Sequence, residues 1–371
     1  MEDIIDFLPI YPDIDDDNFN TKISRKKELN DYKLEKYEKF PEKPGDLFNH
    51  QKLISRFFSS NTPYDQLLLF HDMGTGKTCT SVACIEQIRE ETSIFKKAFI
   101  FTKGELLHKN YKYDLILKCN EKNKYFNGRT SKDNLSYAKI NKYYNFRTFQ
   151  TFASYLLKKT DKYITENYSN TIIIIDEVHN IRFSGDVEDI KIYQQFYRFL
   201  HLIKNSKILL MSGTPMKDTF DEIADIMNLI LPLDKQMVTK KDFINKYFIT
   251  KKKDDNDILY SLNTNTYLIN ELKSFFKGRV SYLKSMQSSI IKKFIGEKNY
   301  NNLNKFIVCP VFMQEIQNKG YEKAYNKDKN TDKDDKSSFD TNSTLASLFV
   351  FPDDDGSYGE NGYKKYVKSN S

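Results

Sequence analysis

Lys77 and Thr78 end the stretch LLLFHDMGTGKT, whose residue types suit the binding of nucleotide phosphates. Gly74 and Gly76 allow unusual backbone angles, and the N–H groups at the start of a following helix favour negative charge. A lysine at this point can reach the β and γ phosphates of ATP, and a threonine hydroxyl can bind Mg²⁺. The residues that we expect to bind ATP here are Met73, Gly74, Thr75, Gly76, Lys77 and Thr78.

His71 stands where the strict pattern G-x-x-x-x-G-K-[ST] has its first glycine. Residues 67–70 form an apolar run that predicts a short buried strand, and residues 79–88 have helical spacing. Strand, loop and helix therefore follow in the order that a phosphate site needs. We interpret His71 as a tolerated departure whose side chain points away from the phosphates. The alternative is an ordinary strand-to-helix turn in which Lys and Thr follow by chance.

The segment IIIIDEVHN, residues 172–180, delivers two carboxylates at the end of another apolar run. Ligands of open α/β sheets lie at the carboxyl ends of the strands. Asp176 can hold Mg²⁺ directly or through water, and Glu177 can orient and deprotonate an attacking water molecule. An isolated Asp-Glu pair more often begins a solvated loop, so this assignment depends on the preceding phosphate loop.

Ser212, Gly213 and Thr214 follow a third apolar run in ILLMSGTPMKD, residues 208–218. Small hydroxyl residues at a strand end can hydrogen-bond the Asp-Glu-Val-His segment, and His179 would connect the nucleotide to the moving parts. Loss of a phosphate would then be felt at a neighbouring surface. Taken alone, the same residues form an ordinary turn.

The alternation of apolar runs with helical patterns from residue 46 to 235 predicts an α/β domain with a doubly wound parallel sheet. Residues 1–45 are acidic and then Lys-rich, and we expect an extended N-terminal arm. For residues 236–371 we expect a polar, partly disordered C-terminal extension with charged flexible segments. Within that extension, KFIVCPVFM and ASLFVFP look strand-like.

The composition bounds the class of protein. No apolar run approaches a membrane span and the acidic N-terminus lacks the basic start of a secretory signal, so we expect a soluble intracellular protein without membrane partners. Four cysteines show neither C-x-x-C pairing nor zinc-site spacing, which favours reduced structural thiols. The net charge of +7 supports nucleic-acid binding only weakly, because richness in Lys, Asn, Ile and Tyr is also typical of an AT-rich genome.

HDMGTGKT, DEVHN and SGTP resemble motifs I, II and III of the superfamily 2 helicase-like (DExH) ATPases, which are P-loop NTPases. More closely, LLLFHDMGTGKT, IIIIDEVHNI, MSGTPMKDTFDEIADIMNLILP and GRVSYLK resemble the ATPases of nucleocytoplasmic large DNA viruses. That group includes poxvirus nucleoside triphosphatase I and the small subunit of the poxvirus early transcription factor. The resemblance covers about residues 45–290 and implies a RecA-like ATP-binding domain at residues 46–235.

The resemblance also places four further residues. Gln51, in NHQ, matches the upstream glutamine that recognises adenine. Thr102 and Lys103, in IFTKGELL, and Thr148, in FRTFQTF, match elements that contact the nucleic-acid backbone. The alternative is that these are ordinary surface and strand-end polar residues.

A second RecA-like lobe with a Q-x-x-G-R-x-x-R arginine finger is not evident in the sequence, because Gly128-Arg129 and Gly278-Arg279 do not fit the pattern. We therefore expect the ATP-binding half of a motor, with ATP and Mg²⁺ as cofactors and nucleic acid, DNA or RNA, as partner. Efficient hydrolysis would need a second lobe, from another chain or from viral transcription machinery. The resemblance suggests a virion or a viral factory in the host cytoplasm.

Two other functions stay open. A catalytically weak or inactive paralogue could use the nucleotide fold as an interaction module. A kinase or GTPase could share the phosphate loop, but the Asp-Glu-Val-His and Ser-Gly-Thr series disfavours those classes.

Overall fold

The computed structural model describes residues 10–33, 45–119, 134–183, 186–216, 218–254, 257–284, 297–298, 307–308, 311–330, 341–352 and 355–369. The chain divides into two compact units, Met1–Ser288 and Ser289–Ser371, and each is described by itself.

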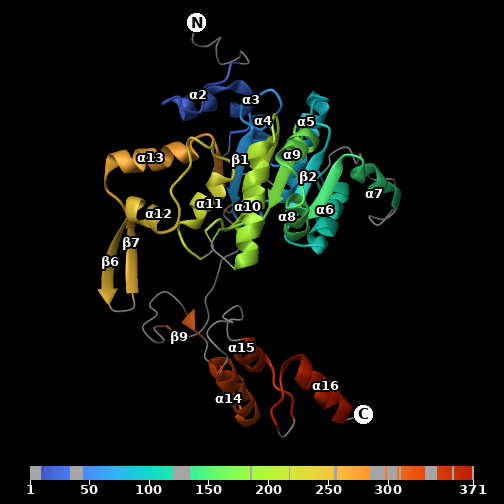
Figure 1. Cartoon of the computed structure of the whole chain (residues 1–371), viewed down its shortest axis with the longest axis vertical. Coiled ribbons are helices and arrows are strands. Elements are labelled where there is room, and N and C mark those ends of the chain that lie inside the picture. Colours follow the sequence, from blue (N-terminus) through green and yellow to red (C-terminus); the bar gives the residue numbers. More distant parts are fainter. Residues whose placement is uncertain are drawn as a thin grey trace. The chain divides into compact units, whose positions relative to one another are not determined.

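Six parallel strands form the central sheet of the first unit (Figure 1), in the order β3-β2-β4-β5-β1-β8. The strands are β1 (Gln66–His71), β2 (Ala98–Thr102), β3 (Tyr144–Thr148), β4 (Ile172–Asp176), β5 (Lys207–Ser212) and β8 (Val280–Leu283). Strand β5 lies between β4 and β1. The expected doubly wound parallel sheet is confirmed, and the three strands that precede the predicted chemical motifs are neighbours.

Helices cover both faces of this sheet, because alternate strand side chains enter two separate hydrophobic cores. In β4, Ile173 and Ile175 pack in one core, while Ile172 and Ile174 pack in the other. The first core also receives α8 (Phe149–Leu156), α9 (Asp161–Tyr168), α10 (Val187–Leu202), α11 (Glu222–Asn228) and α12 (Lys240–Tyr247). The second receives α4 (Asn49–Phe57), α5 (Lys77–Glu91), α6 (Glu105–Leu117) and α7 (Asn134–Asn141). This burial on both faces explains the run of four isoleucines.

The sheet extends beyond the expected boundary at residue 235, because β8 pairs with β1. Between α12 and β8 lie an antiparallel hairpin, β6 (Phe248–Asp254) and β7 (Asp257–Leu262), and α13 (Thr266–Phe276). The sequence could not show this sixth strand, because VSYL is short and follows a polar segment.

The N-terminal arm is not simply extended. It contains two short helices, α2 (Phe19–Arg25) and α3 (Lys27–Asn30), which bury Phe19 and Leu29. The Phe19 ring meets Tyr64 edge-on at 5.5 Å, and the Tyr64 hydroxyl donates to the Pro12 carbonyl at 2.8 Å. The arm therefore packs on the chain that enters β1.

The second unit contains α14 (Glu315–Asn330), α15 (Thr341–Leu348), α16 (Gly359–Ser369) and the two-residue strands β9 (Glu297–Lys298) and β10 (Ile307–Val308). The pair β9–β10 is antiparallel. The expected strand in ASLFVFP is wrong for its first half, since α15 ends at Leu348 and Val350 then bridges Tyr358. In KFIVCPVFM the expected strand is found at Ile307–Val308, which form β10, while residues 305–306 and 309–310 lie outside the described residues. Part of the charged segments and Arg129 also lie outside them. The absence of a complete second lobe stays a prediction.

The expectation of reduced cysteines is wrong for one pair. Cys79, in the first turn of α5, forms a disulfide with Cys119, just after α6, with Cα atoms 4.8 Å apart. The two residues are 40 positions apart, so their approach follows from helix packing and not from a spacing motif. Cys84 is buried, which raises the pKa of its thiol, and Cys309 lies outside the described residues.

Reduction of this disulfide is expected to lower the free energy of unfolding by about 2–4 kcal/mol, because the cross-link restricts the unfolded chain. Urea unfolding with and without reductant measures the effect. The double variant Cys79→Ser/Cys119→Ser should show the lower stability in both conditions. Equal stability of the unaltered chain with and without reductant would contradict the prediction.

Candidate nucleotide-binding site

The loop between β1 and α5 has the backbone that a phosphate-binding loop needs. Gly74 and Gly76 have φ angles of +84° and +79°, a left-handed region that side chains rarely adopt. A Cβ atom at Gly76 would also lie 2.5 Å from the Gln51 amide nitrogen. The Thr75 hydroxyl donates to the Asp72 carbonyl at 2.8 Å, and α5 begins at Lys77. The loop and the N–H groups at the start of α5 together form a site that suits an anion.

Lys77 rests on the carbonyl groups that precede the loop. Its ammonium donates to the carbonyl of His71 at 3.0 Å and to that of Asp72 at 3.4 Å. A Cβ atom at Gly213 would lie 3.3 Å from the same ammonium, so the segment after β5 reaches the phosphate loop. Thr78, in the first turn of α5, is partly exposed. The lysine can therefore exchange carbonyl partners for phosphate oxygens.

Helix α4 holds the loop from behind through two buried side chains. His50 Nε2 is 2.9 Å from the Thr75 carbonyl oxygen, and the Gln51 amide donates to the Gly76 carbonyl at 3.1 Å. Gln51 Oε1 also accepts from the backbone N–H of Phe48 at 2.9 Å. The structure thus brings Gln51 to the loop, while its recognition of adenine stays a prediction. The sequence offered His50 no signal beyond its position next to Gln51.

Asp176 and Glu177 lie at the carboxyl end of β4, two strands from β1. Burial and the neighbouring Glu177 raise the pKa of Asp176 to about 6, although the Lys77 ammonium acts in the opposite direction. A buried carboxyl of this kind is stabilised by added positive charge, which fits an Mg²⁺ ligand. No group of three or more His, Cys, Asp or Glu side chains within the described ranges could hold a metal alone. The roles of Thr78 and Asp176 as Mg²⁺ ligands stay a prediction.

Glu177 has a left-handed backbone, with a φ angle of +53°, although it carries a side chain. Such a conformation costs about 1–3 kcal/mol and tends to occur at functional sites. Its carboxylate lies 3.3 Å from His179 Nδ1. This turn ends β4 and places Glu177 at the sheet edge where the phosphate loop also lies.

His179 and Ser212 join the two later motifs. His179 Nδ1 lies 2.9 Å from Ser212 Oγ, which also accepts from the backbone N–H of Thr214 at 3.0 Å. Gly213 lies between Ser212 and Thr214 in the sequence and approaches Lys77. The structure therefore brings together all four residues predicted to couple the nucleotide to the surface, although their coupling role stays a prediction.

Residues that the sequence analysis missed reinforce this junction. Arg182 forms ion pairs with Asp218 and, at 3.1 Å, with the buried Glu222. The backbone N–H of Phe183 donates to Asp225 Oδ2 at 3.3 Å. These contacts tie the segment after His179 to the start of α11. An arginine followed by acidic residues some 40 positions later gives no recognisable sequence signal.

Asp225 is 1% exposed, and this burial, with the nearby Asp221 and Glu222, raises the pKa of its carboxyl to about 6. A folded-state pKa above the unfolded value of 3.8 means that stability falls as pH rises from about 4 to 6. Asp225→Asn removes the carboxyl group and with it this loss of stability. The free energy of unfolding of the variant minus that of the unaltered chain should rise by on the order of 3 kcal/mol between pH 4 and pH 7.

Urea unfolding at the two pH values measures this difference, and Asp242→Asn, which removes an exposed carboxylate of α12, is the control. A variant whose stability tracks that of the unaltered chain at both pH values would show that Asp225 titrates normally.

The predicted nucleic-acid residues lie at the carboxyl ends of β2 and β3, on the same sheet edge as Asp176. Thr102 is fully buried and its hydroxyl donates to the Gly104 carbonyl at 3.0 Å, so the side chain is not placed to contact a nucleic-acid backbone. Lys103 is exposed. Thr148 caps α8 by accepting from the backbone N–H of Thr151. Lys103 lines a cavity of about 240 Å³ with His179 and Arg182.

Residues 27–217 match the family model described as "Type III restriction enzyme, res subunit". Among curated proteins, "Putative helicase 087L" of Invertebrate iridescent virus 3 is 34% identical over 98% of this chain and 35% of its own length. "Putative helicase 009L" of Frog virus 3 is 31% identical over 82% of this chain and 31% of its own length. The "Early transcription factor 70 kDa subunit" of Yaba monkey tumor virus is 26% identical over 74% and 40%, respectively.

The chain spans about a third of the length of the first two of these relatives. A solved structure, the Sulfolobus solfataricus SWI2/SNF2 ATPase core in complex with dsDNA, is 21% identical and has a TM-score of 0.41. It covers 68% of this chain and 46% of its own. Within the described part of the chain, no helix is both long and apolar enough to cross a membrane.

Proposed function

The chain belongs to the family of the type III restriction enzyme res subunit, among the superfamily 2 helicase-like ATPases, and on this premise we propose that it is the ATP-binding lobe of a viral nucleic-acid-dependent motor. The observation that carries the proposal is the adjacency of β1, β5 and β4. β5 and β4 end at Ser212 and Asp176, and the loop after β1 leads to Lys77 at the start of α5. One sheet edge then carries phosphate binding, metal binding and coupling. Viral transcription or remodelling of nucleic acid is the process that we propose it serves.

Each residue has a defined task in this proposal. Lys77 leaves the His71 carbonyl and binds the β and γ phosphates, while Gly74 and Gly76 allow close approach of the loop. Thr78 and Asp176 would hold Mg²⁺, which would supply positive charge to the phosphates. Glu177 orients the attacking water and accepts its proton. The Gln51 amide donates one N–H to Gly76 and accepts one hydrogen bond from Phe48, so its second N–H and its second lone pair would recognise adenine.

His179 and Ser212 would report the state of the γ phosphate to the sheet edge where Lys103 is exposed. Contacts there would be to the backbone of DNA or RNA, which position a strand without reading its sequence. We propose that a second RecA-like lobe supplies the arginine finger, which is worth about a thousandfold or more in rate. This lobe would come from residues outside Met1–Ser288, in a partner chain or in a longer product.

Steady-state ATP hydrolysis, with and without single-stranded and duplex DNA and RNA, tests the proposal alongside calorimetric measurement of ATP binding. We expect ATP binding with slow turnover, and about a thousandfold acceleration when a second lobe is supplied. Absence of ATP binding would favour an interaction module that no longer uses nucleotide. Fast, nucleic-acid-stimulated turnover by the chain alone would contradict the need for a second lobe.

A further inference from the structure

The imidazole of His71 turns away from the phosphate loop toward β8. His71 is 1% exposed at the end of β1, and its Nε2 lies 2.9 Å from Ser281 Oγ on β8. Its Nδ1 has no hydrogen-bond partner in the described part of the chain. The contact with Ser281 therefore fixes the orientation of a buried ring at the position where the phosphate-loop pattern has glycine.

The backbone of residues 71 and 72 contacts both Lys77 and β8. Its carbonyl accepts from the Lys77 ammonium at 3.0 Å, and the next residue, Asp72, donates its backbone N–H to the Leu283 carbonyl at 2.9 Å. Residues 71 and 72 thus lie between the lysine that would bind phosphate and the end of β8. When Lys77 moves to the phosphates, its hydrogen bond to the His71 carbonyl breaks. The adjacent residue, Asp72, is hydrogen-bonded directly to Leu283 of β8.

The ring also lies against the helix that supports the loop. His50, which contacts the Thr75 carbonyl, meets the His71 ring edge-on with centroids 6.0 Å apart. Burial, with the charges of His50 and Lys77, lowers the pKa of His71 to about 4, so the ring is neutral near pH 7. A neutral ring can pair with a hydroxyl without placing a second positive charge beside Lys77.

We propose that His71 is a positioning residue that couples nucleotide occupancy of the phosphate loop to β8 through Ser281. This inference rests on the proposed function, because it presupposes that ATP draws Lys77 away from the His71 carbonyl. β8 is the last described strand of the first unit, which ends at Ser288. The coupling is reciprocal, so stabilisation of β8 by a partner raises the affinity for ATP.

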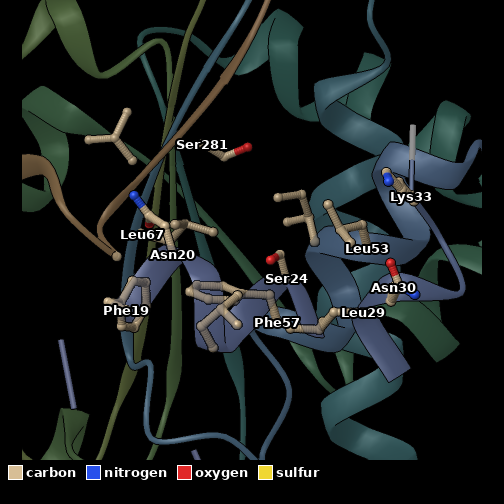
Figure 2. Close-up of a pocket in the computed structure, with 14 residues that line it drawn as sticks. Phe19, Asn20, Ser24, Leu29, Asn30, Lys33, Leu53, Phe57, Leu67 and Ser281 are labelled. Carbon is tan, nitrogen blue, oxygen red and sulfur yellow. The ribbon is translucent and has the colours of Figure 1, made fainter. Parts of the chain in front are cut away.

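A cavity beside this contact makes a selective test possible. Ser281 lines a space of about 430 Å³ with residues of α2, α4 and β1 (Figure 2). Ser281→Ala removes the hydroxyl alone. Ser281→Thr keeps the hydroxyl, and the cavity has room for the added methyl group, which suits a strand. Ser24, on α2, lines the same cavity but donates to the Thr21 carbonyl, so Ser24→Ala is the matched control.

Amide hydrogen exchange of the full chain, with and without ATP and Mg²⁺, measures the coupling in two peptides, one covering residues 72–78 and one covering 279–284. In the unaltered chain we expect ATP to slow exchange in both. In Ser281→Ala the loop peptide should still be slowed, while the slowing in β8 should fall by more than about half, and the dissociation constant of ATP should rise by at most about fivefold. Ser281→Thr and Ser24→Ala should behave as the unaltered chain.

His71→Gly, which restores the strict loop pattern, should also lose the β8 response while it binds ATP. A β8 response that persists in Ser281→Ala overturns the proposal, as does loss of the response in both Ser281→Thr and Ser24→Ala. Slowing in the loop of the unaltered chain without slowing in β8 overturns the coupling but leaves the proposed function intact. Slowing in neither peptide overturns the proposed function, and the coupling with it.

Discussion

Lys77→Ala is expected to raise the dissociation constant of ATP by about a hundredfold or more. The ammonium is the positive charge that the loop itself offers to the β and γ phosphates, and removing one partner of such a charge pair costs about 2–5 kcal/mol. Among the residues that the structure describes, this ammonium contacts two backbone carbonyls and no carboxylate within hydrogen-bond distance. The chain should therefore fold without it. Calorimetric titration with ATP and Mg²⁺ measures the loss.

Lys109→Ala is the matched control, because it removes an exposed lysine from α6 and leaves the loop unchanged. It should bind ATP as the unaltered chain does, and both variants should unfold at the same urea concentration as that chain. Unchanged ATP affinity in folded Lys77→Ala would show that the loop after β1 is not the phosphate site.

The sequence predicted the sheet well because buried parallel strands have a strong signal. LLLF, AFIFT, IIIID and ILLM are short runs whose interiors are apolar because both faces of the strands are buried, and polar residues occur only at the strand ends. Once the strands are parallel, the segments that follow β1, β4 and β5 must lie on one edge. The approach of Gly213 to Lys77 follows from topology, although 136 positions separate the two residues.

The elements that the sequence did not predict depend on contacts between distant residues. β8 is a strand because β1 offers an open edge, and its contact with His71 spans 210 positions. The disulfide likewise arises where α5 meets the end of α6, and the Arg182–Glu222 ion pair arises where the segment after His179 meets α11. None of these pairs has a period or a local spacing. The departure at position 71 was visible in the sequence, but its partner was not.

Asp225 illustrates the same limit for electrostatics. Asp225 lies in the segment DEIADIMN, and aspartate side chains are normally exposed to solvent. In the structure every residue of α11 is buried, and among the described residues the Asp225 carboxyl accepts a single hydrogen bond, at 3.3 Å. The raised pKa follows from packing of α11 beneath the segment after His179. A titration shift of this kind depends on the tertiary structure and not on local sequence.

Glu177→Gln is expected to lower the rate of ATP hydrolysis by about 10²–10⁴-fold and to leave ATP affinity nearly unchanged, because the amide keeps the shape of the side chain but cannot accept a proton. Glu177 has a left-handed backbone with a φ angle of +53°, and glutamine, with the same side-chain shape, adds no backbone strain there. The fold should therefore be preserved. Single-turnover hydrolysis of radiolabelled ATP with excess protein resolves slow rates, with a second lobe supplied where one is found.

Glu166→Gln, on the exposed face of α9, removes a carboxylate far from the loop in sequence and should hydrolyse ATP at the rate of the unaltered chain. Equal hydrolysis by Glu177→Gln would mean that another group orients the water, and the Asp176 carboxyl would be the nearest candidate. Loss of ATP binding in Glu177→Gln would instead assign the residue to the shape of the site. The pairing of Glu177 with His179 at 3.3 Å adds a second readout, since the amide should also weaken any response of hydrolysis to nucleic acid.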